Sequence, residues 1–427
     1  MSEAEQTSAP QRQESAYGSE PVHRWADLEA FHASSEHGDG YHVIEGAHGA
    51  PLELLTIGQP FEQPSGAVLV VFSAAVGKRR TRKPPFVSGR SLGPELGVPL
   101  IAISDPSLAL RGDLNIAWYA GSVFQDVQRA VEELLRPLAV RLDGDLWLIG
   151  GSAGGFGALQ TAHRLGRFCS AFIWNPQTDI ASYMPLYARR YGQIAFPQLA
   201  GRLGNKYWKS LFRKEARGHH RCVDLVRETL PAQSPRRLLY LQSITDSHLK
   251  SHCVPYLRQH GYRRHSAGLW TRGENQVIWQ AETGIGHAAP PAAAIRGILT
   301  RLLASDDATV LERVEQLDEA PIFAGRAVAE RPESLEAQAE LLSEMLSWRL
   351  TGRRIVAESK RLPSGFGRMR WSAVVRDAQD QRLSRSSPTE IPGEWVIPSL
   401  EGADHADVVL SDGFGRVLLR RTLRLGR

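Results

Sequence analysis

The stretch Leu146-Trp147-Leu148-Ile149-Gly150-Gly151-Ser152-Ala153-Gly154-Gly155 joins an apolar run to a glycine-rich turn, and small residues at helical spacing follow it. Gly-x-Ser-x-Gly between a strand and a helix is the pattern of a nucleophile elbow. In such a turn the serine hydroxyl points out above the sheet. Gly150 and Gly154 leave room where a Cβ would collide with a neighbouring strand or helix. The stretch therefore predicts a strand, a tight turn and a helix, with Ser152 as a nucleophile.

A glycine-rich turn has other common uses. A phosphate-binding loop of the Walker type ends in Gly-Lys-Ser or Gly-Lys-Thr, and no lysine stands in this stretch. The Gly-x-Gly-x-x-Gly spacing of a dinucleotide-binding loop is also absent. A plain flexible loop remains as the alternative to the elbow.

Size and composition limit the class of protein. A chain of 427 residues is too long for one ordinary hydrophobic core, so we expect at least two domains. Its hydrophobic content of 42% and charged content of 23% are those of a soluble globular protein. No apolar run is long enough to cross a bilayer, and residues 1–20 lack the pattern of a secretory leader. We therefore expect a cytoplasmic location and no transmembrane segment.

The charged residues and cysteines exclude several kinds of site. The formal net charge of +5 is small for this length and does not indicate nucleic-acid binding. Cys169, Cys222 and Cys253 are too few and too widely spaced for a disulfide framework or a metal cluster. We therefore expect no metal cluster and no nucleic-acid partner, and a serine-dependent mechanism implies no metal and no organic cofactor.

Strand-like and helix-like segments alternate between residues 39 and 305. The clearest predicted strands are the apolar runs at 67–72, 100–104, 146–149, 169–174, 237–241 and 276–280. Continuous apolar strands are typical of parallel sheets that are buried on both faces. Helical patterns follow at about 122–140, 249–260 and 292–303. The alternation predicts an α/β fold with a doubly wound, mostly parallel sheet.

The remaining segments predict the domain organisation. Residues 1–38 are polar and without periodicity, so we expect a disordered tail there. An aromatic, arginine-rich helical segment at 179–230 has the position of a cap or lid. Residues 306–352 are predicted as a helical linker with an acidic amphipathic helix. Short strands separated by turn signals then predict a small β-sandwich domain at 353–427.

A nucleophilic serine needs a base, and the base needs a carboxylate that fixes its tautomer. In enzymes with a nucleophile elbow, the chain order is serine, then Asp or Glu, then histidine. Asp246 follows the predicted strand at 237–241, and His287 follows the strand at 276–280 in a loop with glycines. The sequence therefore predicts a triad of Ser152, His287 and Asp246.

Other interpretations of these residues stay open. Asp246 could simply cap a helix, and His287 could be an exposed loop residue. His248 is a rival base, although it precedes the last strand. Asp105 and Asp179 are rival acids, and Asp105 fits the chain order poorly because it precedes the serine.

An oxyanion hole requires two backbone donors. One is the N–H of Ala153, the residue after the serine. The other is expected in the loop after the strand at 67–72, where small residues let the backbone approach a substrate. Ala74 and Ala75 are the two candidates, and the sequence does not separate them.

Two further segments could bind a substrate. A basic loop at 78–83 follows the oxyanion loop, so Arg80 and Arg82 could bind an anionic group. A solvated basic loop is an equally good interpretation. Asn175 and Gln177 follow the strand at 169–174 and could orient a hydroxyl-rich substrate. Their alternative role is to cap a helix or turn.

Residues 40–305 resemble the α/β-hydrolase superfamily in the elbow and in the positions of Asp246 and His287. The segments 103–108, 118–119, 151–155 and 175–177 also look like bacterial proteins found with surface-glycan biosynthesis. That group includes the O-acetyltransferase of the accessory secretion system, and its members can carry a β-sandwich tail. The resemblance implies removal or transfer of a small acyl group on a glycan or glycoconjugate, with partner proteins of glycan biosynthesis.

The expected function is that of a serine-dependent ester hydrolase or O-acyltransferase, with a small-molecule or glycan ester as substrate. A serine peptidase of the same fold, with residues 179–230 as its gate, is one alternative. A glycan-binding or assembly protein with a degenerate hydrolase site is another. Hydrolysis and transfer differ mainly in the exclusion of water, so both remain open.

Overall fold

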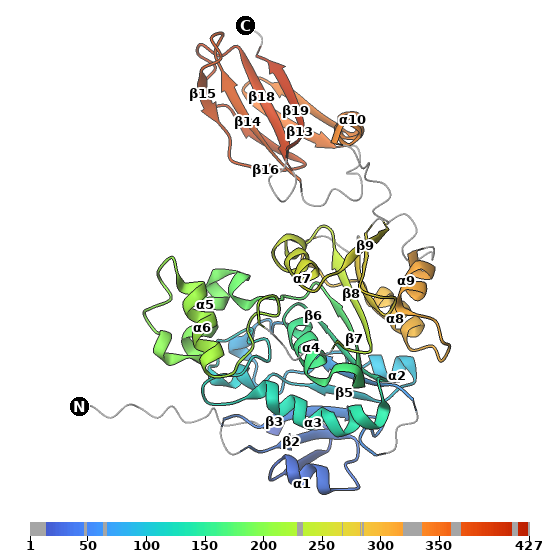
Figure 1. The fold of residues 1–427 in the computed structure, drawn as a ribbon. Helices are drawn as coiled ribbons and strands as arrows, with labels where there is room; N and C mark the ends of the chain where they lie inside the picture. Colours follow the sequence, from blue (N-terminus) through green and yellow to red (C-terminus); the bar gives the residue numbers. More distant parts are fainter. Residues whose placement is uncertain are drawn as a thin grey trace, which may run out of the picture. The chain divides into compact units, whose positions relative to one another are not determined.

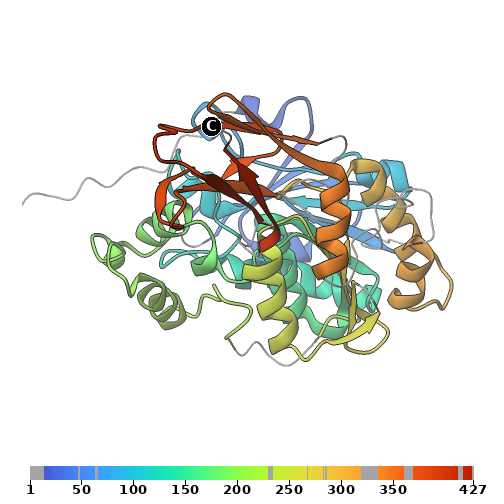
Figure 2. The same ribbon diagram turned by 90° about the horizontal axis from the view of Figure 1, so that it is seen from above.

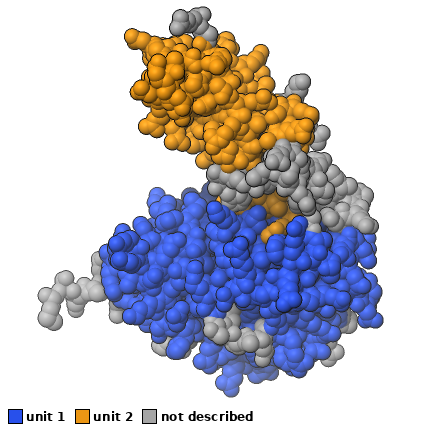
Figure 3. All heavy atoms as spheres, turned by 45° about the horizontal axis from the view of Figure 1, so that its top comes forward, with its two compact units in different colours: residues 1–242, 248–279, 289–317 blue, residues 243–247, 280–288, 318–427 orange. Residues whose placement is uncertain are grey.

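A computed structural model describes residues 14–46, 49–62, 66–228, 234–266, 268–281, 283, 286–318, 335–359, 369–411 and 417–425. The chain forms two compact units, which Figure 3 shows in different colours. Unit 1 comprises residues 1–242, 248–279 and 289–317, and unit 2 comprises residues 243–247, 280–288 and 318–427.

An 11-stranded sheet with the order β1-β2-β3-β5-β4-β6-β7-β8-β11-β10-β9 forms the centre of unit 1 (Figure 1). Its middle strands run parallel: β5 (Leu100–Ile103), β4 (Val68–Phe72), β6 (Leu146–Gly151), β7 (Cys169–Trp174) and β8 (Arg237–Ser243). The flanking strands are β2 (Gly40–Ile44), β3 (Leu52–Ile57), which is antiparallel to both of its neighbours, and β11 (Gln276–Ala281). This order confirms the predicted α/β-hydrolase fold with a mostly parallel, doubly wound sheet.

Helices cover both faces of this sheet because the crossovers run in opposite directions. From β4 the chain passes through α2 (Leu92–Leu96) to β5, then returns through α3 (Val127–Leu142) to β6. Right-handed crossovers in opposite directions place their helices on opposite faces. Accordingly α3 contacts α4 (Ser152–Leu165), whereas α2 contacts α8 (Ala292–Leu302) (Figure 1). Every residue of β4, β5 and β6 is buried, as expected for strands covered on both faces.

The helix α4 approaches the sheet so closely that two glycines are required. A Cβ on Gly154 would lie 2.2 Å from the carbonyl oxygen of Phe72 on β4. A Cβ on Gly150 would lie 2.4 Å from the carbonyl oxygen of Gly154. Real Cβ atoms do not approach backbone oxygens this closely, so the prediction for both glycines is confirmed.

The polar N-terminal segment corrects an expectation. Residues 1–13 lie outside the described residues, but from residue 14 onward the chain is ordered rather than a loose tail. It forms η1 (Glu14–Tyr17), β1 (Val22–Trp25), which pairs in parallel with β2, and α1 (Leu28–Ala33). Phe31 on α1 is fully buried, and its ring packs 5.3 Å from that of Trp25. A few apolar side chains therefore hold an otherwise polar segment.

The predicted cap segment contains α5 (Pro185–Ala195), η6 (Pro197–Leu199) and α6 (Trp208–Gly218). Figures 1 and 2 both show α5 and α6 as a pair on one side of the sheet, away from α8 and α9 (Val310–Asp318) on the other. Tyr191, Phe196 and Phe212 are fully buried between these helices. Much of the aromatic content of this segment therefore serves packing.

The other edge of the sheet carries strands that the sequence did not predict. β10 (Leu269–Thr271) pairs with β11, and β9 (Arg263–Ser266) pairs with β10. All four residues of β9 are exposed, so this strand lacks an apolar signal. The predicted helix at 249–260 is a π-helical turn, η7 (Leu249–Cys253), followed by α7 (Val254–Gln259).

Unit 2 contains two antiparallel sheets that form the predicted β-domain. A three-stranded sheet has the order β12-β13-β17, and β14, β15, β16, β18 and β19 form the other. Their bounds are β12 (Leu346–Thr351), β13 (Arg354–Ser359), β14 (Arg370–Arg376), β15 (Arg382–Arg385), β16 (Thr389–Glu390), β17 (Gly393–Val396), β18 (His405–Ser411) and β19 (Val417–Arg424). The acidic helix of the linker was expected at 335–350, but α10 spans Leu335–Met345. Residues 346–351 form β12 instead and pair with β13. The sequence Asp412-Gly413, one of the turn signals on which the prediction of this domain rests, lies outside the described residues.

Among the described residues, no helix combines the length and the apolar character that crossing a membrane would require.

The buried carboxylate of Asp105 stabilises the segment that follows β5 through two hydrogen bonds. Its two oxygens accept the backbone N–H groups of Ser107 at 3.0 Å and Tyr119 at 2.7 Å. Burial raises the pKa of Asp105 to about 6, although these N–H groups oppose the rise. The folded state therefore binds a proton more tightly at this group than the unfolded chain does.

We expect Gly154→Ala to lower the melting temperature sharply, because the new Cβ would force α4 away from β4. Overpacking of this kind typically costs about 1–3 kcal/mol. Gly218→Ala is the matched control, since Gly218 is also helical and no atom lies within 4 Å of the position that its Cβ would take. Calorimetry of both variants measures the difference, and equal melting temperatures would contradict the close contact.

We expect Asp105 to make the stability of unit 1 depend on pH. Because the folded pKa is raised, its contribution is fully present below about pH 4 and is lost as the pH rises through about 6. A rise of this size corresponds to about 3 kcal/mol at most. Denaturant unfolding of the parent and of Asp105→Asn measures this effect. The free-energy advantage of the parent over the variant should shrink from pH 4.5 to pH 7, and a constant advantage would contradict the assignment.

Candidate active site

Ser152 lies at the junction of β6 and α4, where the elbow was predicted. Its φ is +55°, a left-handed conformation that is costly for a residue with a Cβ. Gly151 before it is still extended, so the backbone reverses its direction at the serine itself. Positive φ at the serine is the local strain that a nucleophile elbow requires.

Gln177 is one side chain that the structure brings to the Ser152 hydroxyl. Its Nε2 donates to Ser152 Oγ at 3.0 Å, and its backbone N–H donates to the Ser152 carbonyl oxygen at 3.3 Å. The other end of the amide, Oε1, accepts a hydrogen bond from Trp118 Nε1 at 3.1 Å. Gln177 is fully buried. The sequence singled out Gln177 for substrate contact, but nothing in it indicated the bond to the serine.

Asn175, the companion residue in the predicted substrate segment, lies at the end of β7. Its Oδ1 accepts a hydrogen bond from Gln242 Nε2 at 3.2 Å, and its backbone N–H donates to Leu241 at 2.9 Å. Both partners belong to β8. Asn175 is buried and has a φ of +43°, so it ties the turn after β7 to the neighbouring strand.

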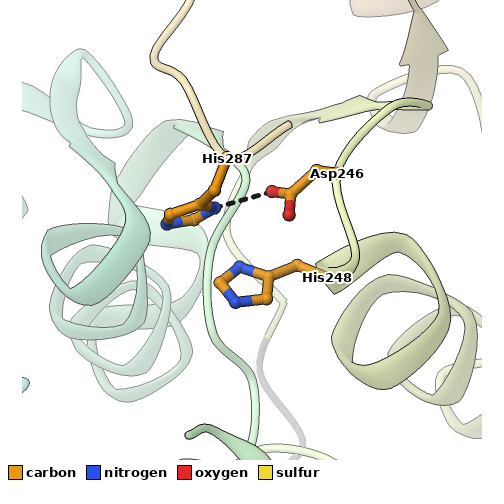
Figure 4. A group of neighbouring side chains, drawn as sticks. All are labelled: Asp246, His248 and His287. Carbon is orange, nitrogen blue, oxygen red and sulfur yellow. Dashed lines mark hydrogen bonds and ion pairs between the residues drawn. The ribbon is translucent and has the colours of Figure 1, made fainter. Parts of the chain in front are cut away.

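Asp246 and His287 form a hydrogen-bonded pair within unit 2. Asp246 Oδ2 lies 2.7 Å from His287 Nδ1, as the dashed line in Figure 4 marks. The Asp246 side chain is fully buried, whereas His287 is exposed. The two loops are also joined by the Gly286 N–H, which donates to Thr245 Oγ1 at 3.0 Å. A carboxylate on Nδ1 selects the tautomer in which Nε2 is the basic nitrogen.

Asp105 and Asp179, the two alternative candidates for the triad acid, bind other partners. Asp105 accepts backbone N–H groups, as described above. Asp179 Oδ2 lies 2.5 Å from Arg213 Nη2, and its Oδ1 caps the turn η5 (Ile180–Ser182). Burial opposes its ionisation, but the Arg213 guanidinium outweighs burial and holds the pKa of Asp179 below its ordinary value.

The rival base, His248, is also drawn in Figure 4. Within unit 1 its ring packs edge-on against the rings of Tyr183 and His252, with centroids 5.6 Å and 4.7 Å away. These aromatic contacts give His248 a packing role beside the cap.

The loop after β4 can supply the expected oxyanion donor. A Cβ on Gly154 would lie 2.9 Å from the Ser73 carbonyl oxygen, so this loop starts beside the first turn of α4. The Ser73 N–H donates to Tyr119 Oη at 2.6 Å and is therefore occupied. Ala74 and Ala75 are exposed, and no acceptor for their N–H groups occurs among the backbone of the described residues. Ala153 lies in the first turn of α4, where N–H groups lack an intrahelical acceptor.

The basic loop is anchored by one buried arginine and exposes the other cations. Arg79 donates to the carbonyl oxygens of Arg82 at 2.6 Å and Leu108 at 2.9 Å. Arg80 and Arg82 are exposed, and the Arg82 guanidinium lies 5.5 Å from the centre of the Phe86 ring. Both cations are therefore accessible from solvent, and in the chain they lie close to the loop that follows β4.

One trio of potential metal ligands lies wholly within the described part of unit 2. Single donor atoms of Asp380, His405 and Asp407 all lie within 4.8 Å of one another. Arg376 Nε lies 3.1 Å from Asp407 and 3.6 Å from Asp380. The Arg376 guanidinium thus already lies beside these carboxylates, and the arrangement fits an ion-pair network.

No family model matches the chain, and no curated protein matches it. Among solved structures it is similar to the capsule O-acetyltransferase of Neisseria meningitidis serogroup A, at 13% identity over 64% of this chain and 96% of that chain, with a TM-score of 0.45. It is also similar to the glycosylation associate protein (Gap123) complex from Streptococcus agalactiae, at 16% identity over 63% and 47% of the two chains, with a TM-score of 0.39. A thermophilic esterase from Thermogutta terrifontis is similar at 13% identity over 66% and 93%, with a TM-score of 0.37. The strand order of unit 1 and the elbow at Ser152 give the chain an α/β-hydrolase fold.

Proposed function

We propose that this protein is a serine hydrolase that cleaves or transfers a small acyl ester. The observation that carries the proposal is the positive φ of Ser152 at the end of a fully buried strand. A strained, non-glycine residue at that point has a cost of about 1–3 kcal/mol, which an ordinary turn would avoid with glycine. Strain of this kind is found where a side chain must be presented to a substrate.

The Asp246–His287 pair supplies the base in this proposal. β6 and β8 belong to the parallel part of one sheet, so their carboxyl ends lie at the same edge. Asp246 follows β8 and His287 follows β11, the next strand in the sheet. Ligands and reacting groups in open α/β sheets gather at this edge.

In the proposed mechanism Ser152 Oγ attacks the ester carbonyl carbon while its proton passes to Nε2 of His287. Asp246 stabilises the imidazolium that forms. The N–H of Ala153 and that of Ala74 or Ala75 bind the oxyanion. The C–O bond to the alcohol then breaks, and the alcohol leaves with the proton from His287. Water or a second hydroxyl attacks the acyl-enzyme, and its proton returns through His287 to Ser152.

The substrate class in this proposal is an acyl ester on a glycan or glycoconjugate. Its basis is the resemblance of the segments 103–108, 118–119, 151–155 and 175–177 to proteins of surface-glycan biosynthesis. The exposed Arg80 and Arg82 extend the proposal to a substrate that carries a negative charge. Partner proteins of glycan biosynthesis belong to the same proposal.

We expect a fluorophosphonate probe to label the protein on Ser152, because phosphonylation requires an activated serine. Mass spectrometry should locate the adduct on the peptide that contains Ser152. Ser152→Ala should abolish labelling, and His287→Gln should slow it by several powers of ten, as the loss of a triad base does. Ser210→Ala, at an exposed serine of α6, is the matched control. An unlabelled parent protein, or an adduct that survives in Ser152→Ala, would contradict the proposal.

We expect Arg80→Glu and Arg82→Glu to raise KM for an anionic acetate ester at least several-fold and to leave KM for a neutral ester unchanged. The physical reason is the loss of attraction, and the gain of repulsion, between the loop and the substrate charge. Arg24→Glu, at an exposed position on the edge strand β1, is the control for the change in net charge. The effect on the anionic ester should weaken as the salt concentration rises. Equal KM values for parent and variants would show that the basic loop does not take part in substrate binding.

A further inference from the structure

We infer that Gln177 is a catalytic hydrogen-bond donor to the reacting oxygen of Ser152, and that Trp118 is the positioning residue that fixes its orientation. The inference rests on two consecutive hydrogen bonds. The first joins Trp118 Nε1 to the Gln177 amide, and the second joins that amide to Ser152 Oγ. The inference also rests on the proposed function, because it assigns a role to the same serine.

The orientation of the Gln177 amide follows from the chemistry of its two partners. An indole nitrogen is a donor only, so the amide atom that faces Trp118 must be the carbonyl oxygen Oε1. The amide nitrogen Nε2 must then face Ser152 Oγ, and it can only donate. Ser152 Oγ therefore accepts this bond, and the serine O–H proton is directed to another acceptor. In the proposed mechanism that acceptor is His287 Nε2.

Trp118 is held in place by an unusually constrained backbone. Trp118 and Tyr119 both have positive φ values, +57° and +55°, although neither is a glycine. Asp105 fixes this pair by accepting the Tyr119 N–H at 2.7 Å. The Trp118 ring is buried, and its centroid lies 5.7 Å and 5.5 Å from those of Tyr183 and Tyr191. Two consecutive strained residues persist only where the surroundings overdetermine them.

The same short segment also positions the oxyanion loop. Tyr119 Oη accepts the Ser73 N–H at 2.6 Å and donates to the Ile103 carbonyl oxygen at 2.8 Å. Ser73 is the residue before Ala74 and Ala75. Trp118 therefore sets the amide at the nucleophile, while Tyr119 sets the start of the loop that offers oxyanion donors. This double use explains why both residues adopt the costly conformation.

An amide donor at Oγ acts twice, once when the acyl-enzyme forms and once when it breaks down. As Ser152 loses its proton to His287 and forms the Oγ–C bond, negative charge builds on Oγ before the bond is complete. The Gln177 N–H, which keeps its own proton, stabilises that charge from a fully buried side chain. When the second tetrahedral intermediate collapses, the Oγ–C bond breaks and the same donor stabilises Oγ as the leaving group. His287 then returns the proton to Oγ.

Gln177→Met tests the donor, because methionine keeps the length and removes both amide groups. We expect the second-order rate constant of fluorophosphonate labelling to fall about 100- to 1,000-fold, as for the loss of a single hydrogen-bond donor to a reacting oxygen. Hydrolysis of p-nitrophenyl acetate should lose kcat with little change in KM. Gln160→Met is the matched control, since Gln160 is a buried glutamine on α4 that does not contact Ser152. Its labelling rate should stay within about two-fold of the parent.

Gln177→Glu gives a readout that a purely structural role would not move. The ionised carboxylate cannot donate to Oγ and would instead attract the serine proton away from the base. Protonation restores one donor. The labelling rate of Gln177→Glu relative to the parent should therefore rise as the pH falls, while the same ratio for Gln177→Met stays flat.

A double-mutant cycle tests the positioning role of Trp118. Trp118→Phe removes the indole donor and lets the Gln177 amide turn over, so we expect slower labelling in an otherwise intact protein. If Trp118 acts through Gln177, adding Trp118→Phe to Gln177→Met should slow labelling little further. Fully multiplicative effects of the two substitutions would overturn the positioning role.

The two proposals fail in distinguishable ways. A parent protein that the probe does not label would overturn the proposed function. A parent that labels on Ser152, together with Gln177→Met that labels at the same rate and melts at the same temperature, would overturn only the role of Gln177. Should Gln177→Met fail to fold, the pH dependence of Gln177→Glu still decides, because a flat ratio contradicts donation to Oγ.

Discussion

The direct backbone contact between α4 and the sheet is the constraint on which the rest of the site depends. Gly154 has room for hydrogen alone, because a Cβ there would lie 2.2 Å from the Phe72 carbonyl oxygen and 2.9 Å from that of Ser73. This approach forces the chain to reverse its direction within one residue, and Ser152 takes the strain as a φ of +55°. It also brings the first turn of α4, with the Ala153 N–H, beside the loop that continues to Ala74 and Ala75. The proposed nucleophile and the candidate oxyanion donors thus have one structural origin.

The elbow could be predicted from the sequence because its signals are local. An apolar run, a glycine on each side of the serine and small residues after it all fall within a dozen positions. The buried parallel strands were predictable for the same reason, since β4 to β6 have continuous apolar sequences. The strands that the sequence did not predict lie toward the edges of the large sheet or in sheets with one exposed face. β1 has the sequence VHRW and β9 the sequence RRHS, and polar residues protect such edges from pairing with other chains.

The contacts of Gln177 could not be predicted, because they join segments that are far apart in the chain. Gln177 lies 25 residues from Ser152 and 59 residues from Trp118. No rule of spacing relates these positions, and only the packing of two separate loops against the start of α4 brings them together. The left-handed backbone of Trp118 and Tyr119 is equally invisible in the sequence, since neither residue type favours it. Strained sites of this kind are where local preference and final structure are expected to disagree.

Three aspartates were considered as the acid of the triad. Their bonding partners distinguish their roles, whereas their burial does not. Asp105, Asp179 and Asp246 are all buried, so burial does not separate them. Asp105 accepts backbone N–H groups and Asp179 is paired with Arg213, which commits each to holding a turn or an ion pair. Of the three, Asp246 is the one paired with an imidazole. A carboxylate can fix a tautomer and stabilise an imidazolium only through such a pair. The chain order favoured Asp246 for the same role on independent grounds, and this agreement between sequence order and side-chain geometry is the reason to assign the proposed acid to it.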